Sequence, residues 1–354
     1  MKIVKTSDFD SFRCLADKCT DTCCTGWEID VDEASLERFE HLDEPIRERL
    51  YQAIDFNRGI IKYNDKGVCA LLREDGLCSL VCDYGEDILC EICHMYPRHV
   101  EEYDGVREWS LALSCPEAAR MAINCEEISF LVEENDEEEP YAEDFEDFDY
   151  MLYTQLEDSR EVIYTILNSK DLYILKALGI VLTYTKELQD CIESNELFRM
   201  QDVTDKYRES YLDIEPCNEF AFDKLDVLYS YISENIEVLH TLECLRDSWQ
   251  DKLDDIEKSL LEGRGYFKES FCMNERAVRN IAVILIYTYY LGAVYDDYLY
   301  PKAAMSVYIS IMMAYATSVF GMENIISVVS SMAREIEHSD DNLNAIEEYF
   351  YKDV

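Results

Sequence analysis

Cysteine is the residue type in this sequence that is best suited to chemistry and most unevenly placed. The chain has 354 residues and fifteen cysteines. Eleven lie in the first 125 residues, at Cys14, Cys19, Cys23, Cys24, Cys69, Cys78, Cys82, Cys90, Cys93, Cys115 and Cys125. In a reducing compartment such a dense set of thiols more often binds metal or takes part in catalysis than forms disulfides. The sequence therefore predicts a metal site in the amino-terminal third, roughly residues 14 to 116.

The first cysteine cluster places four thiols between Cys14 and Cys24, in the order C-x4-C-x3-CC. Asp17, Lys18 and Asp21 interleave these thiols. A set of buried cysteines would need a continuous apolar face, which these charged residues interrupt. Thiolates that converge on a metal explain the density better.

Two more cysteine clusters follow in the same third of the chain. The second runs from Cys69 to Cys82, with glycines beside its cysteines, and the third is the CxxC pair Cys90 and Cys93. Together the three clusters supply more than the four ligands that a zinc site or a [4Fe-4S] cluster requires, so two metal sites are possible. The spacing alone leaves zinc and iron-sulfur open.

Aromatic and basic residues near the cysteines are candidates for cofactor binding. Arg98 can hold a carboxylate through two hydrogen bonds, or pair with one of the many acids. Trp27 and Tyr96 can contact a lysine or a sulfonium by cation-π attraction, or simply keep water from the site. His94, next to Cys93, is expected to be structural, because a lone histidine more often makes a structural hydrogen bond.

The residues around these cysteines resemble the flagellin lysine-N-methylases, within a wider set of proteins with a CxxxCxxCC-type cluster. The resemblance covers about the first 120 residues in consistent order. It is carried by Phe12, Cys14, Cys19, Cys23-Cys24-Thr25-Gly26-Trp27, Gly67-Val68-Cys69, Leu72, Gly76-Leu77-Cys78, Leu89-Cys90, Cys93, Tyr96-Pro97-Arg98, Ser110-Leu111 and Ser114-Cys115-Pro116-Glu117-Ala118-Ala119-Arg120. The first motif is one residue longer at two places than the wider pattern. Cys82 and Cys125 have no place in it.

The resemblance implies an enzyme that transfers a methyl group from S-adenosylmethionine to lysine amines of flagellin, with a [4Fe-4S] cluster taking part. The implied metal ligands are Cys14, Cys19, Cys23, Cys24, Cys69, Cys78, Cys90, Cys93 and Cys115. The residues alone also permit a zinc-binding structural or interaction module without catalysis, or a redox or metal-handling protein that uses CxxC thiols. A Rossmann methyltransferase is not expected, because the sequence has no glycine-rich loop between a strand and a helix.

Methyl transfer to lysine requires that the ammonium group lose a proton, for which a carboxylate or a tyrosine is suited. Asp21 and Glu28 flank the first cysteine motif. Nothing distinguishes either of them among 76 acidic residues. The sequence therefore leaves the catalytic residues unassigned.

The formal net charge of −44 limits the class of partner. A field of this sign repels a phosphate backbone, so nucleic acid is not an expected partner. It attracts a basic protein surface, although solubility alone is a sufficient reason for it. The first ten residues carry charges where a secretory signal would have an apolar run, so we expect a cytoplasmic protein.

The composition changes between Glu126 and Asp149, where thirteen of twenty-four residues are acidic. We predict an acidic linker or loop at residues 126–149, between a cysteine-rich metal domain at 1–125 and an all-α domain at 150–354. Helical spacing of apolar residues predicts helices over 171–188, 222–239 and 239–261. The apolar stretches 281–295 and 303–322 are expected to be buried helices of a bundle, without membrane insertion. The predicted fold is mainly α, with an irregular cysteine-rich metal-binding region packed on a helical domain.

Overall fold

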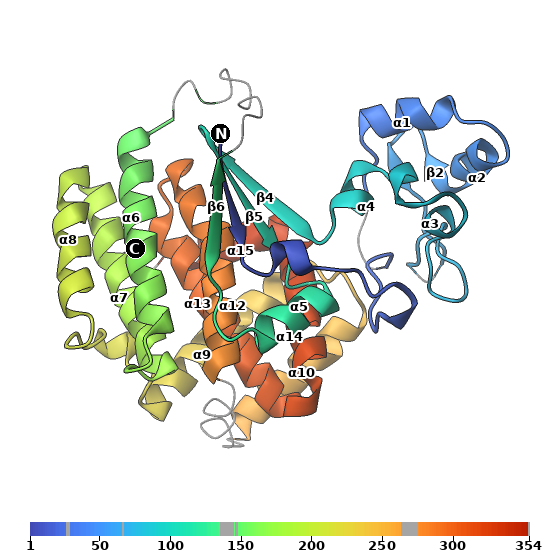
Figure 1. Cartoon of the computed structure of the whole chain (residues 1–354). Coiled ribbons are helices and arrows are strands. Elements are labelled where there is room, and N and C mark those ends of the chain that lie inside the picture. The colour runs from blue at the N-terminus through green and yellow to red at the C-terminus, as the bar shows by residue number, and fades with distance from the viewer. Residues whose placement is uncertain (26–28, 66, 135–144, 146–147, 263–274, 353–354) are drawn as a thin grey trace.

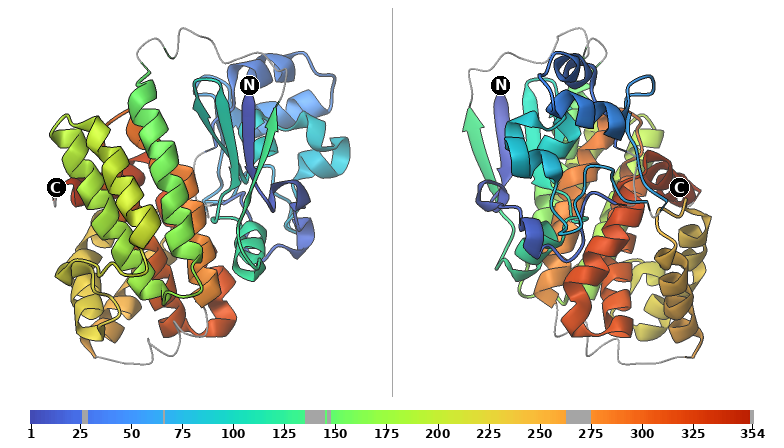
Figure 2. Two further views of the ribbon diagram at one scale, coloured as in Figure 1. Left: turned by 60° about the vertical axis from the view of Figure 1, so that its left-hand side comes forward. Right: turned by 90° about the vertical axis from the view of Figure 1, so that its right-hand side faces the viewer.

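The computed structural model describes residues 1–25, 29–65, 67–134, 145, 148–262 and 275–352. Helices dominate these residues, which confirms the mainly α prediction. The chain forms a large helical body with a small sheet on one face, and a cysteine-rich lobe beyond the sheet (Figure 1). The left view of Figure 2 shows the sheet between the lobe and the helices α6 (Tyr150–Asn168), α7 (Ile174–Glu193) and α8 (Leu197–Ser210).

The helical body consists of helices from the second half of the chain. They are α6 (Tyr150–Asn168), α7 (Ile174–Glu193), α8 (Leu197–Ser210), α9 (Leu225–Thr241), α10 (Ser248–Leu261), α12 (Glu275–Tyr289), α13 (Leu299–Phe320), α14 (Ile325–Glu337) and α15 (Asp340–Tyr351). The side chain of Asp149 caps the start of α6 by accepting a hydrogen bond from Leu152 N at 2.9 Å. Ser339 caps α15 in the same way through Asn342 N.

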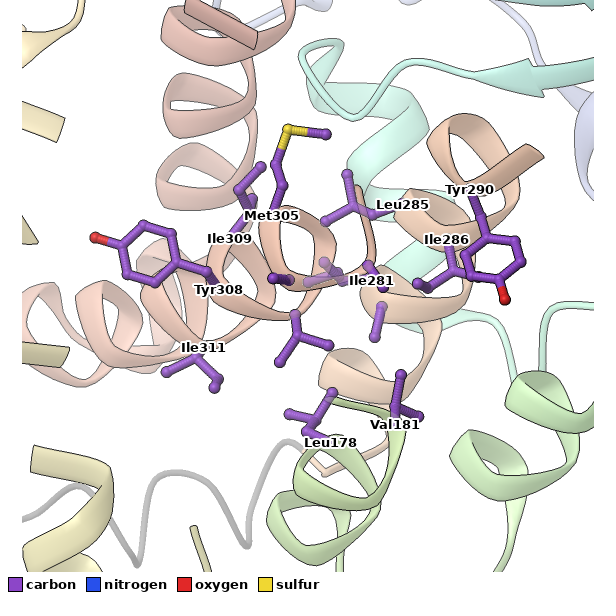
Figure 3. Packing of buried hydrophobic residues seen from close by; sticks show 14 of the residues in the cluster. Leu178, Val181, Ile281, Leu285, Ile286, Tyr290, Met305, Tyr308, Ile309 and Ile311 are labelled. Atoms are coloured by element: carbon purple, nitrogen blue, oxygen red, sulfur yellow. The ribbon is translucent and has the colours of Figure 1, made fainter. Parts of the chain in front are cut away.

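Helix α13 lies at the centre of this body and is apolar on all sides, as a fully buried helix should be. Its side chains pack against α7 and α12, and Leu178 of α7, Ile281 of α12 and Tyr308 of α13 all belong to this core (Figure 3). Both α12 with its continuation to Val294 and α13 are long and apolar enough to cross a membrane, but most of their residues are buried inside the protein. Both helices therefore lie in the core of the bundle, as the sequence predicts.

A four-stranded sheet covers one face of the helices, and the sequence analysis missed it. Its strands are β1 (Lys2–Thr6), β4 (Arg98–Tyr103), β5 (Val106–Leu111) and β6 (Phe130–Glu134), in the order β4-β5-β1-β6. Strand β1 is parallel to β5 and antiparallel to β6, and β4 and β5 form an antiparallel pair. Strand β6 lies inside the segment that we predicted to be a linker. This part of the acidic segment is therefore an edge strand.

Buried polar contacts join the sheet to the helices. Arg160 of α6 is paired with Glu108 of β5 through two hydrogen bonds, one of them 2.7 Å long, and both side chains are almost fully buried. The hydroxyl of Tyr287 on α12 donates to the backbone oxygen of Val4 at 3.0 Å. The sheet and the helices therefore share one core, and the amino-terminal residues that form the sheet belong to the helical body.

The cysteine-rich lobe, residues 29–95, has a separate small core. Its elements are α1 (Glu33–Glu40), α2 (Ile46–Ala53), β2 (Ile54–Asp55), β3 (Ile60–Ile61), α3 (Ser79–Tyr84) and α4 (Glu91–Met95). Phe39, Leu50 and Leu80 are buried in this core. Asp32 joins the two ends of the lobe, because its carboxylate accepts hydrogen bonds from Ser35 N at 2.7 Å and Glu91 N at 2.9 Å.

One predicted helix is wrong in its bounds. The pattern over 239–261 predicts a single helix, whereas α9 ends at Thr241 and α10 begins at Ser248. The break between them is held by contacts from the last helices: Glu243 N donates to Asn342 at 2.7 Å and Leu245 N to Glu335 at 2.8 Å. Apolar spacing continues across the break, so the sequence alone does not reveal it.

Candidate functional site

Arg334 of α14 holds the loop that carries the first cysteine cluster, here called the thiol loop (residues 14–25). Its side chain is completely buried. Nη1 donates to the backbone oxygen of Thr22 at 3.0 Å and lies 3.3 Å from the Asp21 carboxylate, and Nη2 donates to the backbone oxygen of Ser114 at 3.2 Å. One guanidinium therefore fixes the thiol loop and the residue before Cys115 at the same place.

Arg246, in the break between α9 and α10, holds the thiol loop from a second side. Its guanidinium makes two hydrogen bonds to the Asp21 carboxylate, at 2.9 and 3.0 Å, and a third to Thr25 Oγ1 at 3.2 Å. Asp21, one of the acids considered as a base, is thus engaged by two arginines. Its role is to anchor the loop.

Five predicted ligands form one set, the lobe group, against the core of the cysteine-rich lobe. Cys69 and Cys90 are buried in that core, and Cys24, Cys78 and Cys93 pack against it. The backbone N–H of Cys69 donates to the oxygen of Cys24 at 2.9 Å, which brings the thiol loop beside the second cysteine cluster. Burial raises the pKa of the Cys69 thiol to about 12, and the neighbouring charges of Cys24 and Cys78 add to this effect.

The other four predicted ligands form a second set, the junction group, between the thiol loop and the start of α5 (Pro116–Asn124). Cys115 directly precedes α5 and is buried. Burial raises the pKa of its thiol to about 11, with a further contribution from the charges of Cys19 and Cys14. Cys23 also interacts with the charges of Cys14 and Cys115. These interactions place the four thiols near one another.

The adjacent residues Cys23 and Cys24 connect the two groups. The thiol of Cys23 donates to the sulfur of Cys24, which lowers the pKa of Cys24 to about 7 and raises that of Cys23. A similar hydrogen bond from Cys93 lowers the pKa of Cys90. Because the thiolate is the form that binds metal, the lowered pKa values of Cys24 and Cys90 favour metal binding at two sulfurs of the lobe group.

The chemistry of this donor set fits a thiophilic metal, since soft thiolates select zinc and iron-sulfur clusters. In the described part of the chain, however, no three His, Cys, Asp or Glu side chains are arranged as the ligands of a metal ion. The structure thus brings the predicted cysteines together in two groups without closing a ligand set. The nine ligands and the cluster stay predictions.

The two cysteines without a place in the motif, Cys82 and Cys125, belong to neither group. Cys82 is exposed on α3, and Cys125 is half-buried after α5, where its thiol donates to the backbone oxygen of Glu127 at 3.2 Å. Substitution of Cys82 or Cys125 therefore serves as a control for substitution of a predicted ligand.

The predicted cofactor-binding residues lie beside the junction group where the structure describes them. The Tyr96 hydroxyl is 3.2 Å from Ser114 Oγ, and the pKa of Tyr96 is raised by burial and by the charge of Cys115. The guanidinium of Arg98 lies over the ring of Phe12, 5.6 Å from its centre. Trp27 and the acid Glu28 lie outside the described residues, and His94 is exposed on α4.

A cluster of polar side chains includes Tyr96, and the sequence analysis missed its other members. We call it the Glu337 cluster; its members are Tyr96, His99, Ser114, Tyr289, Glu337 and His338. The Glu337 carboxylate accepts hydrogen bonds from Ser114 N at 3.3 Å and from the Tyr289 hydroxyl at 3.4 Å. His338 Nε2 is 2.9 Å from Ser114 Oγ. The cluster therefore joins α14 and α12 to the junction group.

Burial perturbs both titratable groups at the end of α14. It raises the pKa of Glu337 to about 7, against the opposing charge of His99. It lowers the pKa of His338 to about 3, and the charge of Arg334 adds to this shift. At neutral pH His338 is therefore uncharged. In the sequence the run from Arg334 to His338 has the pattern of a solvated helix face, and only the tertiary structure shows that it is enclosed.

Comparison with known proteins identifies the helical domain. Residues 160–354, more than half of the chain, match the family described as FliB lysine N-methylase C-terminal domain. The chain belongs to the FliB lysine N-methylase family. The resemblance found at the cysteines and the match of the carboxy-terminal helices thus agree on one family. Arg246, Arg334 and Glu337 all lie within the matched region.

Named relatives cover a shorter region. The flagellar biosynthetic protein FliU of Salmonella muenchen is 31% identical over 121 residues, which are 32% of this chain and 72% of the relative. The lysine-N-methylases of Salmonella typhimurium and Salmonella choleraesuis are also 31% identical over 121 residues, but these are only 30% of each relative. No solved structure matches the chain.

Proposed function

We propose that this FliB-family chain is an S-adenosylmethionine-dependent protein-lysine N-methyltransferase that acts on flagellin with the help of an iron-sulfur cluster. Relatives named lysine-N-methylase and the family description support lysine methylation, and the relative named flagellar biosynthetic protein supports a flagellar substrate. The observation that carries the proposal is the position of Arg334. It brings the matched helical domain and both ends of the junction group into direct contact.

The cysteines that would hold the cluster are among the nine motif cysteines of the lobe group and the junction group. A bound cluster would supply an iron that can take a ligand from substrate or cofactor in addition to the protein thiolates. The protein contributes the arrangement around that place. Arg334 and Arg246 fix the thiol loop. The hydrogen bond from Cys23 lowers the pKa of Cys24, and the charge of Arg334 adds to this shift, whereas burial raises the pKa of Cys19 against the charge of Arg334.

The reaction also requires binding of the methyl donor and of the protein substrate, and charged groups are suited to both. Arg98 lies beside the junction group and is suited to bind the carboxylate of S-adenosylmethionine through two hydrogen bonds. The net charge of −44 attracts a lysine-bearing protein surface and increases the rate of encounter. Arg98, which the sequence analysis selected, would thus bind the cofactor, and the acidic surface would attract the substrate.

The experiment that tests the proposal uses anaerobically purified protein. We expect brown protein that contains iron and sulfide, and methyl transfer from S-adenosylmethionine to lysines of purified flagellin, detected by mass spectrometry. Colourless protein with stoichiometric zinc and no methyl transfer would instead establish a structural zinc module. Flagellin from cells with and without the gene completes the test, because unchanged methyl-lysine in the deletion strain rejects flagellin as the substrate.

A further inference from the structure

Glu337 differs in its charge environment from the enclosed carboxylates that are held in ion pairs. Asp21 is paired with Arg246 and Arg334, Glu108 with Arg160, and Glu347 with Lys302. Among the residues that the structure describes, none makes a salt bridge to Glu337. Its carboxylate accepts hydrogen bonds from the two neutral donors Ser114 N and Tyr289 Oη. A carboxylate in this setting can accept a proton without breaking an ion pair.

The residues around Glu337 are enclosed but keep some exposed surface. Glu337, Tyr289, Tyr96 and His99 are each half-buried, so they combine enclosure with partial contact to solvent. Tyr96 and Tyr289 offer aromatic rings beside that carboxylate, and aromatic rings attract ammonium groups.

Glu337 is linked directly to the thiol site. Ser114, whose N–H it accepts, immediately precedes Cys115, and the Ser114 hydroxyl contacts both Tyr96 and His338. The rings of Tyr96 and His338 meet edge to face, with centres 5.6 Å apart. The carboxylate therefore lies beside the junction group and not on the outer surface of α14.

We propose that Glu337 is the general base that takes the proton from the substrate lysine before methyl transfer, an inference that rests on the proposed function. The ammonium proton moves to the Glu337 carboxylate. The lone pair of the neutral amine then attacks the methyl carbon of the sulfonium donor. A C–N bond forms, the S–CH3 bond breaks with its electron pair going to sulfur, and the products are a methylated ammonium and a neutral thioether. Glu337 later releases its proton to solvent.

The groups that face Glu337 from the surrounding elements are compatible with this role. His99 of β4 and Tyr289 of α12 act on Glu337 directly, and Glu101 of β4 acts on Tyr289. On α14 and just after it, the charge of Arg334 acts on His338. Glu347 of α15 interacts with Tyr289 but is paired with Lys302 of α13 at 2.7 Å. Burial in this setting raises the pKa of Glu337 to about 7, close to the operating pH that suits a general base.

The test compares Glu337→Gln with Glu335→Gln under single-turnover conditions, with S-adenosylmethionine and purified flagellin. The amide introduced by E337Q keeps an oxygen that can accept from Ser114 N but does not accept a proton from lysine. We expect the wild-type rate to level off above about pH 7. We expect the E337Q rate to be lower by about 10²–10⁴-fold at pH 7. It should rise with pH as the substrate lysine loses its proton to solvent. Glu335 is buried on the same helix and directed toward Leu245, so E335Q should keep the wild-type pH profile.

A spectroscopic measurement provides a readout independent of turnover. The infrared difference between wild type and E337Q should show a carboxyl band that titrates near pH 7. A lysine-bearing peptide should shift this band, and the same peptide with acetyl-lysine should not. Tyr289→Phe removes one donor to the carboxylate and should move the inflection of the rate profile to higher pH, which decides the question if E337Q does not fold.

The outcomes separate the two proposals. An active wild type with an E337Q variant of equal rate and equal pH profile rejects the base and leaves the methyltransferase standing. An E337Q variant that loses iron or melts at a lower temperature, together with an unshifted Tyr289→Phe profile, assigns Glu337 a structural role and rejects the base. A wild type that contains iron yet methylates no lysine, with a carboxyl band insensitive to the lysine peptide, rejects both proposals.

Discussion

Arg334 donates to the backbone oxygen of Ser114 at 3.2 Å and so joins helix α14 to the residue that precedes Cys115. The same guanidinium donates to the oxygen of Thr22, which precedes the Cys23–Cys24 pair. The two segments of the junction group are more than ninety residues apart in sequence, and a single buried side chain sets their relative position.

Replacement of Arg334 by methionine should destabilise the protein and loosen the thiol loop. It leaves the Asp21 charge and two backbone oxygens without this partner, and breaking a buried pair typically costs about 3–5 kcal/mol. Urea unfolding measures the loss, and metal analysis should show reduced iron. Arg199→Ala, which removes an exposed arginine of α8, should leave both measurements at wild-type values. Equal iron and equal stability in R334M would contradict the anchoring role.

Asp21 and Arg246 should show a measurable coupling in a double-mutant cycle. Both side chains are partly buried and make two hydrogen bonds, so we expect an interaction free energy of about 1 kcal/mol. Asp21→Asn, Arg246→Ala and the double variant provide the cycle, measured by urea unfolding. Additive single effects would show that Asp21 is held by Arg334 alone.

The Arg160–Glu108 pair should be costly to break and much less costly to replace. Glu108→Gln leaves a buried guanidinium without its counter-charge, and we expect a loss of about 3–5 kcal/mol in the free energy of unfolding. The double variant E108L/R160M should recover most of that loss, because it removes both charges. Glu215→Gln in the exposed Lys176–Glu215 pair is the control and should change stability little. A double variant as unstable as E108Q would contradict this account.

Glu335 should make the stability of the protein fall as pH rises through the weakly acidic range. Burial raises its pKa in the folded protein to about 7, above the ordinary value of 4.5. The folded state therefore holds this proton more tightly, so the contribution is complete below about pH 4.5 and is lost as pH rises to about 7. The difference in unfolding free energy between wild type and E335Q should fall by on the order of 3 kcal/mol across this interval. A difference that is constant with pH would contradict the assignment.

The nine motif cysteines should differ from the two outside the motif in metal binding. Cys69→Ser in the lobe group and Cys115→Ser in the junction group should each reduce the iron content of anaerobically purified protein. Cys82→Ser and Cys125→Ser should leave it unchanged, because Cys82 is exposed and Cys125 bonds to the backbone oxygen of Glu127. Loss of iron in C82S equal to that in C69S would invalidate the ligand assignment.

The sequence was most informative where chemistry depends on local spacing. The cysteine clusters indicated a thiol-rich segment and its family, and the two long apolar stretches predicted the core helices α12 and α13. The sheet was missed because β1, β4, β5 and β6 are short, and β6 is part of an acidic run that has the composition of a linker. Arg334 and Glu337 could not be recognised, because their function depends on contacts with Thr22 and Ser114 that only folding creates.

The Arg334 anchor has a consequence for biosynthesis. A ribosome makes the thiol loop first and Arg334 near the end, so a nascent chain carries eleven cysteines for most of its synthesis before their partner helix exists. Contacts of such long sequence separation form late in folding. Insertion of the proposed cluster should therefore follow synthesis of α14, and a truncated product that lacks α14 should display loose, oxidisable thiols to the cell's quality-control machinery.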